Sequence, residues 1–179
     1  TGGLLGFVVL GPIGALVGSV IGSNLSSRSK RKRPNNFDKQ VAFFAALFAC
    51  LAKIAKADGR VDESEIKKIE EIISIKLNLN KEHRKFAINI FQKAKDDNVS
   101  FESYASNIYQ ILSSSQNSLL VFYEILFELA LAVGILHPKE DELLKKIPRI
   151  FRFDKNVYKS LYEKYVDQNR NYYEVLGLS

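Results

Sequence analysis

Ala55-Lys56-Ala57-Asp58-Gly59-Arg60-Val61-Asp62-Glu63-Ser64-Glu65 decides the fold, because a related stretch follows 75 residues later. The second stretch runs Ala130-Leu131-Ala132-Val133-Gly134-Ile135-Leu136-His137-Pro138-Lys139-Glu140. Two alanines, the glycine and the final glutamate are identical in the two copies, and hydrophobic positions on either side also match. Each copy predicts a helix, a glycine turn, a cap and a second helix. Two such hairpins are too few for an open solenoid, so they predict one helical domain with internal pseudo-symmetry.

The remaining chain shows the same helical periodicity. Apolar residues recur at three- and four-residue steps, and turn formers or capping residues separate the runs. About seven helices are predicted, over residues 37–56, 62–77, 81–95, 100–112, 119–133, 138–151 and 154–165. No run alternates, so the fold class is all-α with no sheet. The run over 119–133 is the most hydrophobic and is expected to be the central helix; it is too short to cross a bilayer.

The charge is localised in one short segment. The net charge is +6, and Arg28-Ser29-Lys30-Arg31-Lys32-Arg33 alone carries +5, which leaves +1 from residue 34 onward. Nucleic-acid binding needs basic residues spread over a folded face, so this function is excluded. The single cysteine, Cys50, rules out a disulfide within the chain. The predicted organisation is an N-terminal segment (1–27), a basic linker (28–36), the helical domain (37–166) and a C-terminal segment (167–179).

The N-terminal segment predicts a glycine-rich membrane anchor. Residues 2–25 carry no charge, and about 20 apolar residues suffice to span a bilayer as a helix. Gly14, Gly18 and Gly22 share one helix face, which would let two anchors pack closely and form a homodimer. Two alternatives stay open: a glycine-rich hairpin that packs on the domain, or a segment that lies at the membrane interface. A secretory signal is disfavoured, because the basic run follows the apolar stretch instead of preceding it.

The basic run predicts the topology of that anchor. Arg28, Lys30, Arg31, Lys32 and Arg33 directly follow the uncharged stretch. By the positive-inside rule this flank stays cytoplasmic, so the bulk of the chain is expected on the cytoplasmic side of the membrane, with a single crossing. The same side chains are suited to anionic lipid headgroups. The alternative is a solvated linker.

Three acidic residues of the first turn are the candidate metal ligands. Asp58, Asp62 and Glu65 offer hard oxygen atoms of the kind that calcium and magnesium prefer. The alternative is structural: Asp58 precedes the turn glycine, Asp62 caps the next helix, and Glu65 completes a capping box. His83 and His137 lie far apart, which disfavours zinc. No nucleophile lies beside a base in a recognisable motif, so no enzyme is expected and no cofactor beyond a divalent cation.

The repeated turn resembles that of the TerB-like domain, the helical module of tellurite resistance. The stretch Ala57-Asp58-Gly59-Arg60-Val61-Asp62-Glu63-Ser64-Glu65 and its echo carry this resemblance, which covers residues 37–165. The resemblance implies an all-α bundle. The family's acidic positions match Asp58, Asp62 and Glu65 in the first copy, but only Glu140 matches in the second.

The C-terminal segment resembles the opening of a J domain, the module that stimulates Hsp70. Asn171-Tyr172-Tyr173-Glu174-Val175-Leu176-Gly177-Leu178-Ser179 carries this resemblance, with Tyr172, Tyr173 and Leu176 as its key positions. Together with the anchor and the TerB-like middle, it resembles the membrane-anchored DnaJ-like co-chaperones, which implies a location at the bacterial inner membrane. Hsp70 (DnaK) is then the expected partner, and the TerB-like domain would bind a client or position the J domain. The His-Pro-Asp motif of J domains is absent, so the 179 residues alone are not expected to stimulate Hsp70. The alternatives are a metal-binding or stress-response module, or a membrane scaffold.

Overall fold

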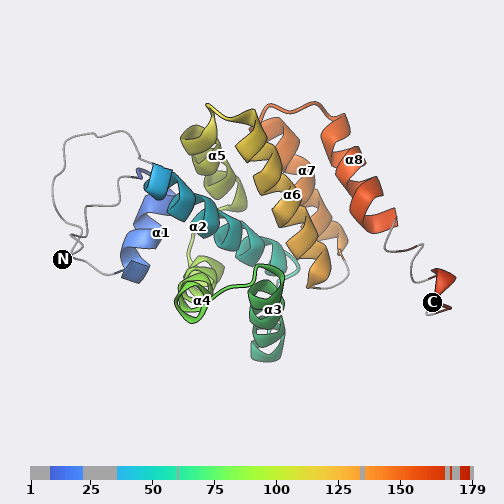
Figure 1. Ribbon diagram of the computed structural model, residues 1–179, viewed down its shortest axis with the longest axis horizontal. Coiled ribbons are helices and arrows are strands. Elements are labelled where there is room, and N and C mark those ends of the chain that lie inside the picture. Colours follow the sequence, from blue (N-terminus) through green and yellow to red (C-terminus); the bar gives the residue numbers. More distant parts are fainter. Residues whose placement is uncertain are drawn as a thin grey trace.

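The computed structural model describes residues 9–21, 36–59, 61–133, 136–167, 170 and 174–177 (Figure 1). These residues form helices and turns, with no strand among them. The elements are α1 (Pro12–Ile21), α2 (Asn36–Ala55), α3 (Glu63–Lys76), α4 (Lys81–Asp96), α5 (Phe101–Leu112), α6 (Gln116–Ala132), α7 (Pro138–Ile150), α8 (Asn156–Tyr162) and the π-helical turn η2 (Glu163–Asp167). The all-α fold is confirmed, and α2 to α8 are the seven helices that the periodicity predicts.

Local capping explains where most helices begin. The side chains of Asn80, Ser100 and Ser115 each accept a hydrogen bond from the backbone N–H three residues later. Such caps satisfy N–H groups that have no partner within the helix. The Ser115 cap also explains one difference from the sequence prediction. It starts α6 at Gln116, three residues before the predicted start at residue 119.

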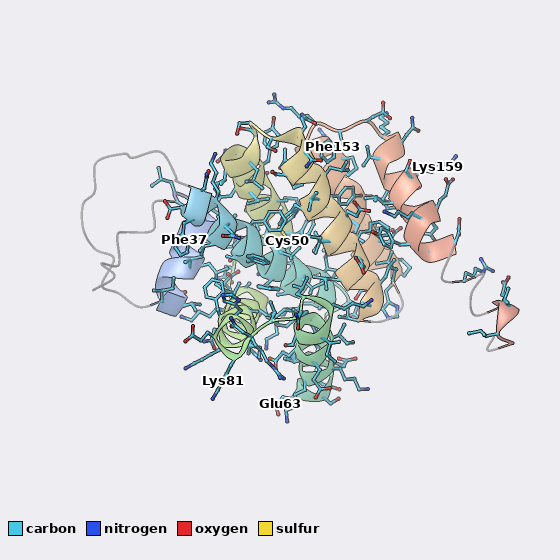
Figure 2. The ribbon with its side chains drawn as sticks, in the orientation of Figure 1. Phe37, Cys50, Glu63, Lys81, Phe153 and Lys159 are labelled. Atoms are coloured by element: carbon cyan, nitrogen blue, oxygen red, sulfur yellow. The ribbon has the colours of Figure 1, made fainter. Side chains whose placement is uncertain are left out.

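Helix α2 is the centre of the bundle, which corrects the prediction that α6 is. It packs against α1, α4, α5, α6 and α7, and it crosses the middle of the molecule (Figure 1). Cys50 lies in its C-terminal half and is fully buried (Figure 2). The buried alanines of α2 allow neighbouring helices to approach closely on several sides: Ala42, Ala45, Ala46, Ala49 and Ala52. Small side chains lower the hydrophobicity of α2, so hydrophobicity alone ranks α6 above it.

A polar contact fixes the end of α4 against α2 and α5. The Lys53 ammonium of α2 lies 2.7 Å from a carboxylate oxygen of Asp97, which follows α4 directly. The hydroxyl of Tyr104, on α5, donates to the other oxygen of the same carboxylate. Burial, together with this carboxylate, raises the pKa of the Tyr104 hydroxyl. The hydroxyl therefore stays protonated and acts as a donor.

Aromatic side chains fill the space between α2, α6 and α7. The Phe122 ring of α6 lies 5.2 Å from the Phe43 ring and 5.8 Å from the Phe151 ring, measured between centroids. Both Phe122 and Phe151 are fully buried. Tyr123 is buried as well, and its hydroxyl donates to the Leu144 carbonyl over 2.9 Å. These contacts join the second repeat hairpin, α6 and α7, to the first.

The two repeat hairpins have the register that the sequence predicts. Helix α3 begins at Glu63 and α7 begins at Pro138, which is the same position 75 residues on. Their last residues, Lys76 and Ile150, differ by one residue from that spacing. Gly59 has φ +112°, a conformation that side chains with a Cβ rarely adopt. The turn therefore requires the glycine that marks the first copy.

Helix α1 packs on the domain. It contacts α2, α4 and α5, and its Ile13, Leu16 and Val17 side chains are buried. The described part of the predicted anchor is therefore a ten-residue helix, about 15 Å long at 1.5 Å per residue, in the packed arrangement that the sequence left open. No helix within the described ranges has both the length and the apolar character needed to cross a bilayer.

Candidate functional site

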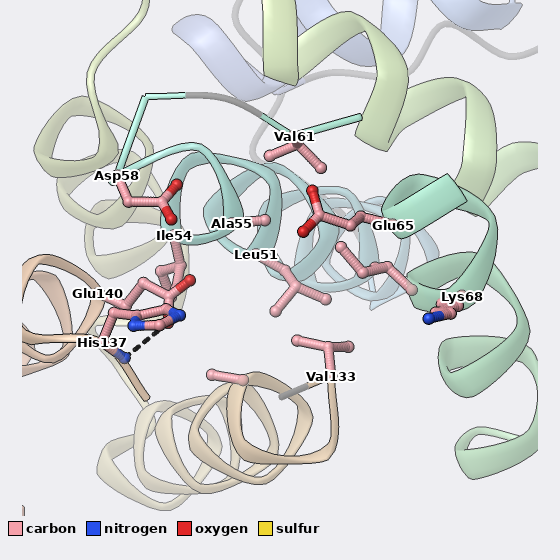
Figure 3. A pocket seen from close by; sticks show the side chains of 12 residues that line it. Leu51, Ile54, Ala55, Asp58, Val61, Glu65, Lys68, Val133, His137 and Glu140 are labelled. Atoms are coloured by element: carbon pink, nitrogen blue, oxygen red, sulfur yellow. Dashed lines mark hydrogen bonds between the residues drawn. The ribbon is translucent and has the colours of Figure 1, made fainter. Parts of the chain in front are cut away.

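A pocket lies between the two copies of the repeat, where both helical turns meet (Figure 3). Its volume is about 270 Å³, and its walls come from α2, α3, α6 and the segment that starts α7. Apolar side chains such as Leu51 and Val133 form its floor, and the polar side chains at its edge are Asp58, Glu65, Lys68, His137 and Glu140. The pocket thus combines an apolar floor with a mostly acidic rim.

The pseudo-symmetry of the sequence is visible in the pocket itself. Ala55 and Ala130 line it from equivalent positions of α2 and α6, and Glu65 and Glu140 do so from equivalent positions of α3 and α7. Figure 3 shows Glu65 and Glu140 on opposite sides of Leu51. The two hairpins therefore face each other across the floor, each with one glutamate at the rim.

Capping boxes hold the two glutamates in place. In the first copy, Asp62 Oδ1 accepts from the Glu65 N–H (2.9 Å) and from the Ser64 hydroxyl (2.7 Å), and the Asp62 N–H donates to Glu65 Oε2 (3.0 Å). In the second copy, the His137 N–H donates to Glu140 Oε2 over 3.0 Å. The predicted capping box at Asp62 is confirmed, and His137 occupies the cap position of α7.

The electrostatics of the capping residues differ between the two copies. The Glu65 N–H and the Ser64 hydroxyl lower the pKa of the Asp62 carboxyl. Burial raises the pKa of the Glu140 carboxyl; the nearby charge of Asp58 also raises it, whereas contacts with His137 lower it. The second copy therefore carries the carboxyl that takes up a proton more readily.

The predicted metal ligands are not brought together as one set. Asp58 and Glu65 line the pocket, but Asp62 is not among its lining residues. One carboxylate oxygen of Asp62 and one of Glu65 are engaged by the capping box. In the part of the chain that the structure describes, no three His, Cys, Asp or Glu side chains gather as a metal site. The observed caps account for two of the three acidic residues without a metal ion.

The described lining of the pocket carries no hydroxyl or thiol side chain. Among the twelve described residues that line it, none is a serine, threonine, cysteine or tyrosine. Cys50 lies elsewhere, in the core, where burial raises the pKa of its thiol and keeps it protonated. A pocket with an apolar floor and a charged rim is suited to holding a side chain or a short segment of another molecule.

Most of the other predicted site residues lie outside the described residues. These are Gly22, Arg28, Lys30, Arg31, Lys32, Arg33, Tyr172 and Tyr173. Of the J-domain positions only Leu176 is described, and half of its surface is exposed. Gly14 and Gly18 are on α1: a Cβ at Gly14 would lie 1.8 Å from the Val9 carbonyl oxygen, whereas a Cβ at Gly18 would meet nothing within 4 Å.

Sequence reasoning missed one polar side chain, Asn107 of α5. It is only 6% exposed, yet both ends of its amide are hydrogen-bonded to the backbone around α1. The available signal was its position, because it lies three residues after Tyr104 and one before Ile108 on the apolar face of α5. A polar residue on such a face needs a partner once it is buried.

Comparison with known proteins agrees with this architecture. The model of the family "Tellurite resistance protein TerB" matches residues 44–162. The match begins within α2 and ends with α8, so it includes both repeat hairpins and the pocket between them. The chain belongs to the TerB family.

The chain is also similar to curated co-chaperones. It is 29% identical to co-chaperone protein DjlA of Coxiella burnetii, over 97% of this chain and 68% of that protein. It is 31% identical to DjlA of Photobacterium profundum, over 85% of this chain and 59% of that protein. The identity to DjlA of Escherichia coli is 28%, over 73% and 49% of the two chains. The chain thus spans about half to two thirds of these relatives, and no solved structure matches it significantly.

Proposed function

We propose that this chain is part of a DjlA-like co-chaperone. In this proposal the TerB-like domain binds a client or partner protein, and it positions a J domain that acts on Hsp70 (DnaK). The chain itself contributes binding and positioning, and the chemistry of ATP hydrolysis belongs to Hsp70.

The extent of the similarity to DjlA carries this proposal. The TerB family model covers residues 44–162, whereas the similarity to the Coxiella burnetii co-chaperone covers 97% of the chain. The similarity therefore extends beyond the TerB-like domain into the segments on either side. A TerB-like domain in another setting would share only the domain.

The described C-terminal residues fit a connection to further structure. Val175 is 85% exposed and Leu176 is 50% exposed, and both belong to the segment that resembles a J-domain start. Apolar side chains of this size gain free energy when they pack against a neighbouring element. A J domain that continues from this segment would supply that element.

Membrane tethering is the second part of the proposal. Residues 2–25 are uncharged, and the basic run from Arg28 to Arg33 follows them directly. This order favours an anchor whose basic flank stays on the cytoplasmic side, next to anionic headgroups. Self-association through the glycine face remains part of the same hypothesis.

The reading frame beyond Ser179 provides the first test. A His-Pro-Asp sequence within roughly 30 to 40 residues is expected, which is the reach of a helical hairpin at about 1.5 Å per residue. A stop codon at that point, or a continuation without the motif, would contradict the J-domain assignment. The TerB-like domain would then need another partner.

The tethering is tested by flotation of the chain with vesicles of anionic phospholipid. We expect the chain to float, and to stay with the vesicles after carbonate extraction. Recovery in the soluble fraction would refute the anchor. Gly18→Leu is the cleaner probe of self-association, because Gly18 has open space around it. Gly14→Leu would also collide with the Val9 carbonyl, so it would disturb both the glycine face and the local backbone packing.

A further inference from the structure

The backbone of helix α1 is hydrogen-bonded to the domain near both of its ends. The Ile13 N–H, in the first turn of α1, donates to Asn107 Oδ1 over 3.0 Å. Asn107 Nδ2 donates to the Leu10 carbonyl over 3.1 Å. At the other end, Lys93 Nζ donates to the Ser19 carbonyl over 3.1 Å. A side-chain amide thus holds the N-terminal end of the helix, and a cation holds its C-terminal end, where the helix dipole favours it.

Apolar side chains on one face of α1 and just before it supply the remaining contacts. Val9, Ile13, Leu16 and Val17 are buried, whereas Leu10 remains 76% exposed. The groove between α2, α4 and α5 therefore favours a helix that is apolar on one face. It also favours a length of about ten residues, because its polar groups bind the backbone near the two ends of the helix. It does not require a particular sequence on the outer face.

One position of the occupant is restricted by geometry. Gly11 has φ +93°, and a Cβ there would lie 2.8 Å from Asn107 Nδ2. A side chain at this position is strained and collides with the amide that holds the helix. The groove thus accepts a helix preceded by glycine.

Docking in this groove and spanning a membrane exclude each other. A helix that spans the bilayer needs about 20 residues, so an anchor over residues 2–25 would include all of α1. Once α1 is in the bilayer, the groove and the Asn107 amide lose their occupant. A buried apolar groove with a polar clamp is then open to another segment.

We propose that the groove between α2, α4 and α5 is a binding site for a charge-free, apolar helical segment of a second protein, and that α1 is its exchangeable resident occupant. This inference rests on the proposed co-chaperone function, since such segments are exposed in unfolded or membrane-destined clients. Asn107 and Lys93 hold the backbone ends of the segment, and the groove buries one apolar face. The site therefore accepts many sequences that share this chemistry.

The test uses the 179-residue chain and a fluorescent peptide of residues 9–21 with a solubilising lysine tail. In the wild-type chain the tethered α1 competes at an effective concentration of about 1 mM, so the peptide binds weakly. Gly11→Val expels the tethered α1 and leaves the groove unchanged. We expect this variant to bind the peptide at least tenfold more tightly than the wild type, by fluorescence anisotropy.

Matched controls identify the groove as the site. Gly18→Ala, on the same helix but with no neighbour within 4 Å, is expected to behave as the wild type. Adding Asn107→Leu to Gly11→Val removes the gain, and a peptide that itself carries Gly11→Val does not bind. Equal binding by the wild type and Gly11→Val, or a gain that survives Asn107→Leu, would overturn the proposal.

A second variant guards against a folding defect. Val17→Asp places a charge on the buried face of α1, and it is expected to free the groove in the same way. If both variants lose their helical circular dichroism, α1 is an integral part of the fold and the proposal is wrong. A failure here leaves Hsp70 stimulation by the whole protein untouched, because that measurement does not depend on what occupies the groove.

Discussion

Replacing Asn107 by leucine is expected to release α1 from the domain while the rest of the bundle stays folded. The substitution removes an acceptor 3.0 Å from the Ile13 N–H and a donor 3.1 Å from the Leu10 carbonyl. A buried polar group left without a partner costs about 1–3 kcal/mol. Two such groups, partly rehydrated as the helix loosens, make the free energy of docking of α1 less favourable by about 3 kcal/mol.

Amide hydrogen exchange measures this loss segment by segment. At about 1.4 kcal/mol for each factor of ten, the protection of the α1 amides should fall roughly 100-fold. Protection in α6 should stay as it is in the wild type. Ser106→Ala is the matched control, because this neighbour on α5 is exposed. Unchanged protection of α1 in the Asn107→Leu chain would refute the view that this amide holds the helix.

Three further predictions concern the domain. Phe122→Ala should lower the free energy of unfolding in urea by about 3–5 kcal/mol, because loss of the buried ring leaves a cavity. The control Val121→Ala, at an exposed position, should change it by less than about 0.5 kcal/mol. Equal effects of the two substitutions would contradict the packing. Hydrogen bonds from Lys164 and then Tyr165 lower the pKa of Glu124 below its ordinary 4.5, so its stabilising contribution is complete above that pH and is lost as the pH falls through the lowered pKa. Glu124→Gln should therefore flatten the acid side of the stability profile, and an unchanged profile would refute the contact. Calcium should leave the thermal midpoint unchanged, since capping occupies two of the predicted ligands; a rise that depends on calcium concentration would restore the metal site.

Local signals in the sequence predicted much of the fold. The glycine turn at Gly59, the capping box from Asp62 to Glu65 and the proline that starts α7 act within a few residues, so their effects are readable without tertiary structure. The similarity between the two stretches 75 residues apart added one long-range prediction, namely that the helices of the two hairpins begin and end at equivalent positions. The pocket between the two hairpins was not predicted, because it depends on how their side chains pack against each other.

The parts that sequence did not predict depend on packing between distant segments. Asn107 and the start of α1 lie more than 90 residues apart in the sequence, and neither segment carries a local signal that identifies the other as its contact. The charge-free stretch around α1 is equally compatible with lipid and with an apolar groove, since both bury the same side chains. Similarly, the central place of α2 comes from its small alanines, which give close approach but little hydrophobic signal.

The most direct test of the proposed co-chaperone function is single-turnover ATP hydrolysis by Hsp70 in the presence of the whole protein encoded by this reading frame. We predict that the whole protein accelerates hydrolysis, and that replacing the histidine of its His-Pro-Asp motif by glutamine abolishes the effect. The 179 residues described in this sequence should not accelerate hydrolysis by themselves. A whole protein that folds but leaves the hydrolysis rate unchanged would contradict the assignment to the DjlA-like co-chaperones.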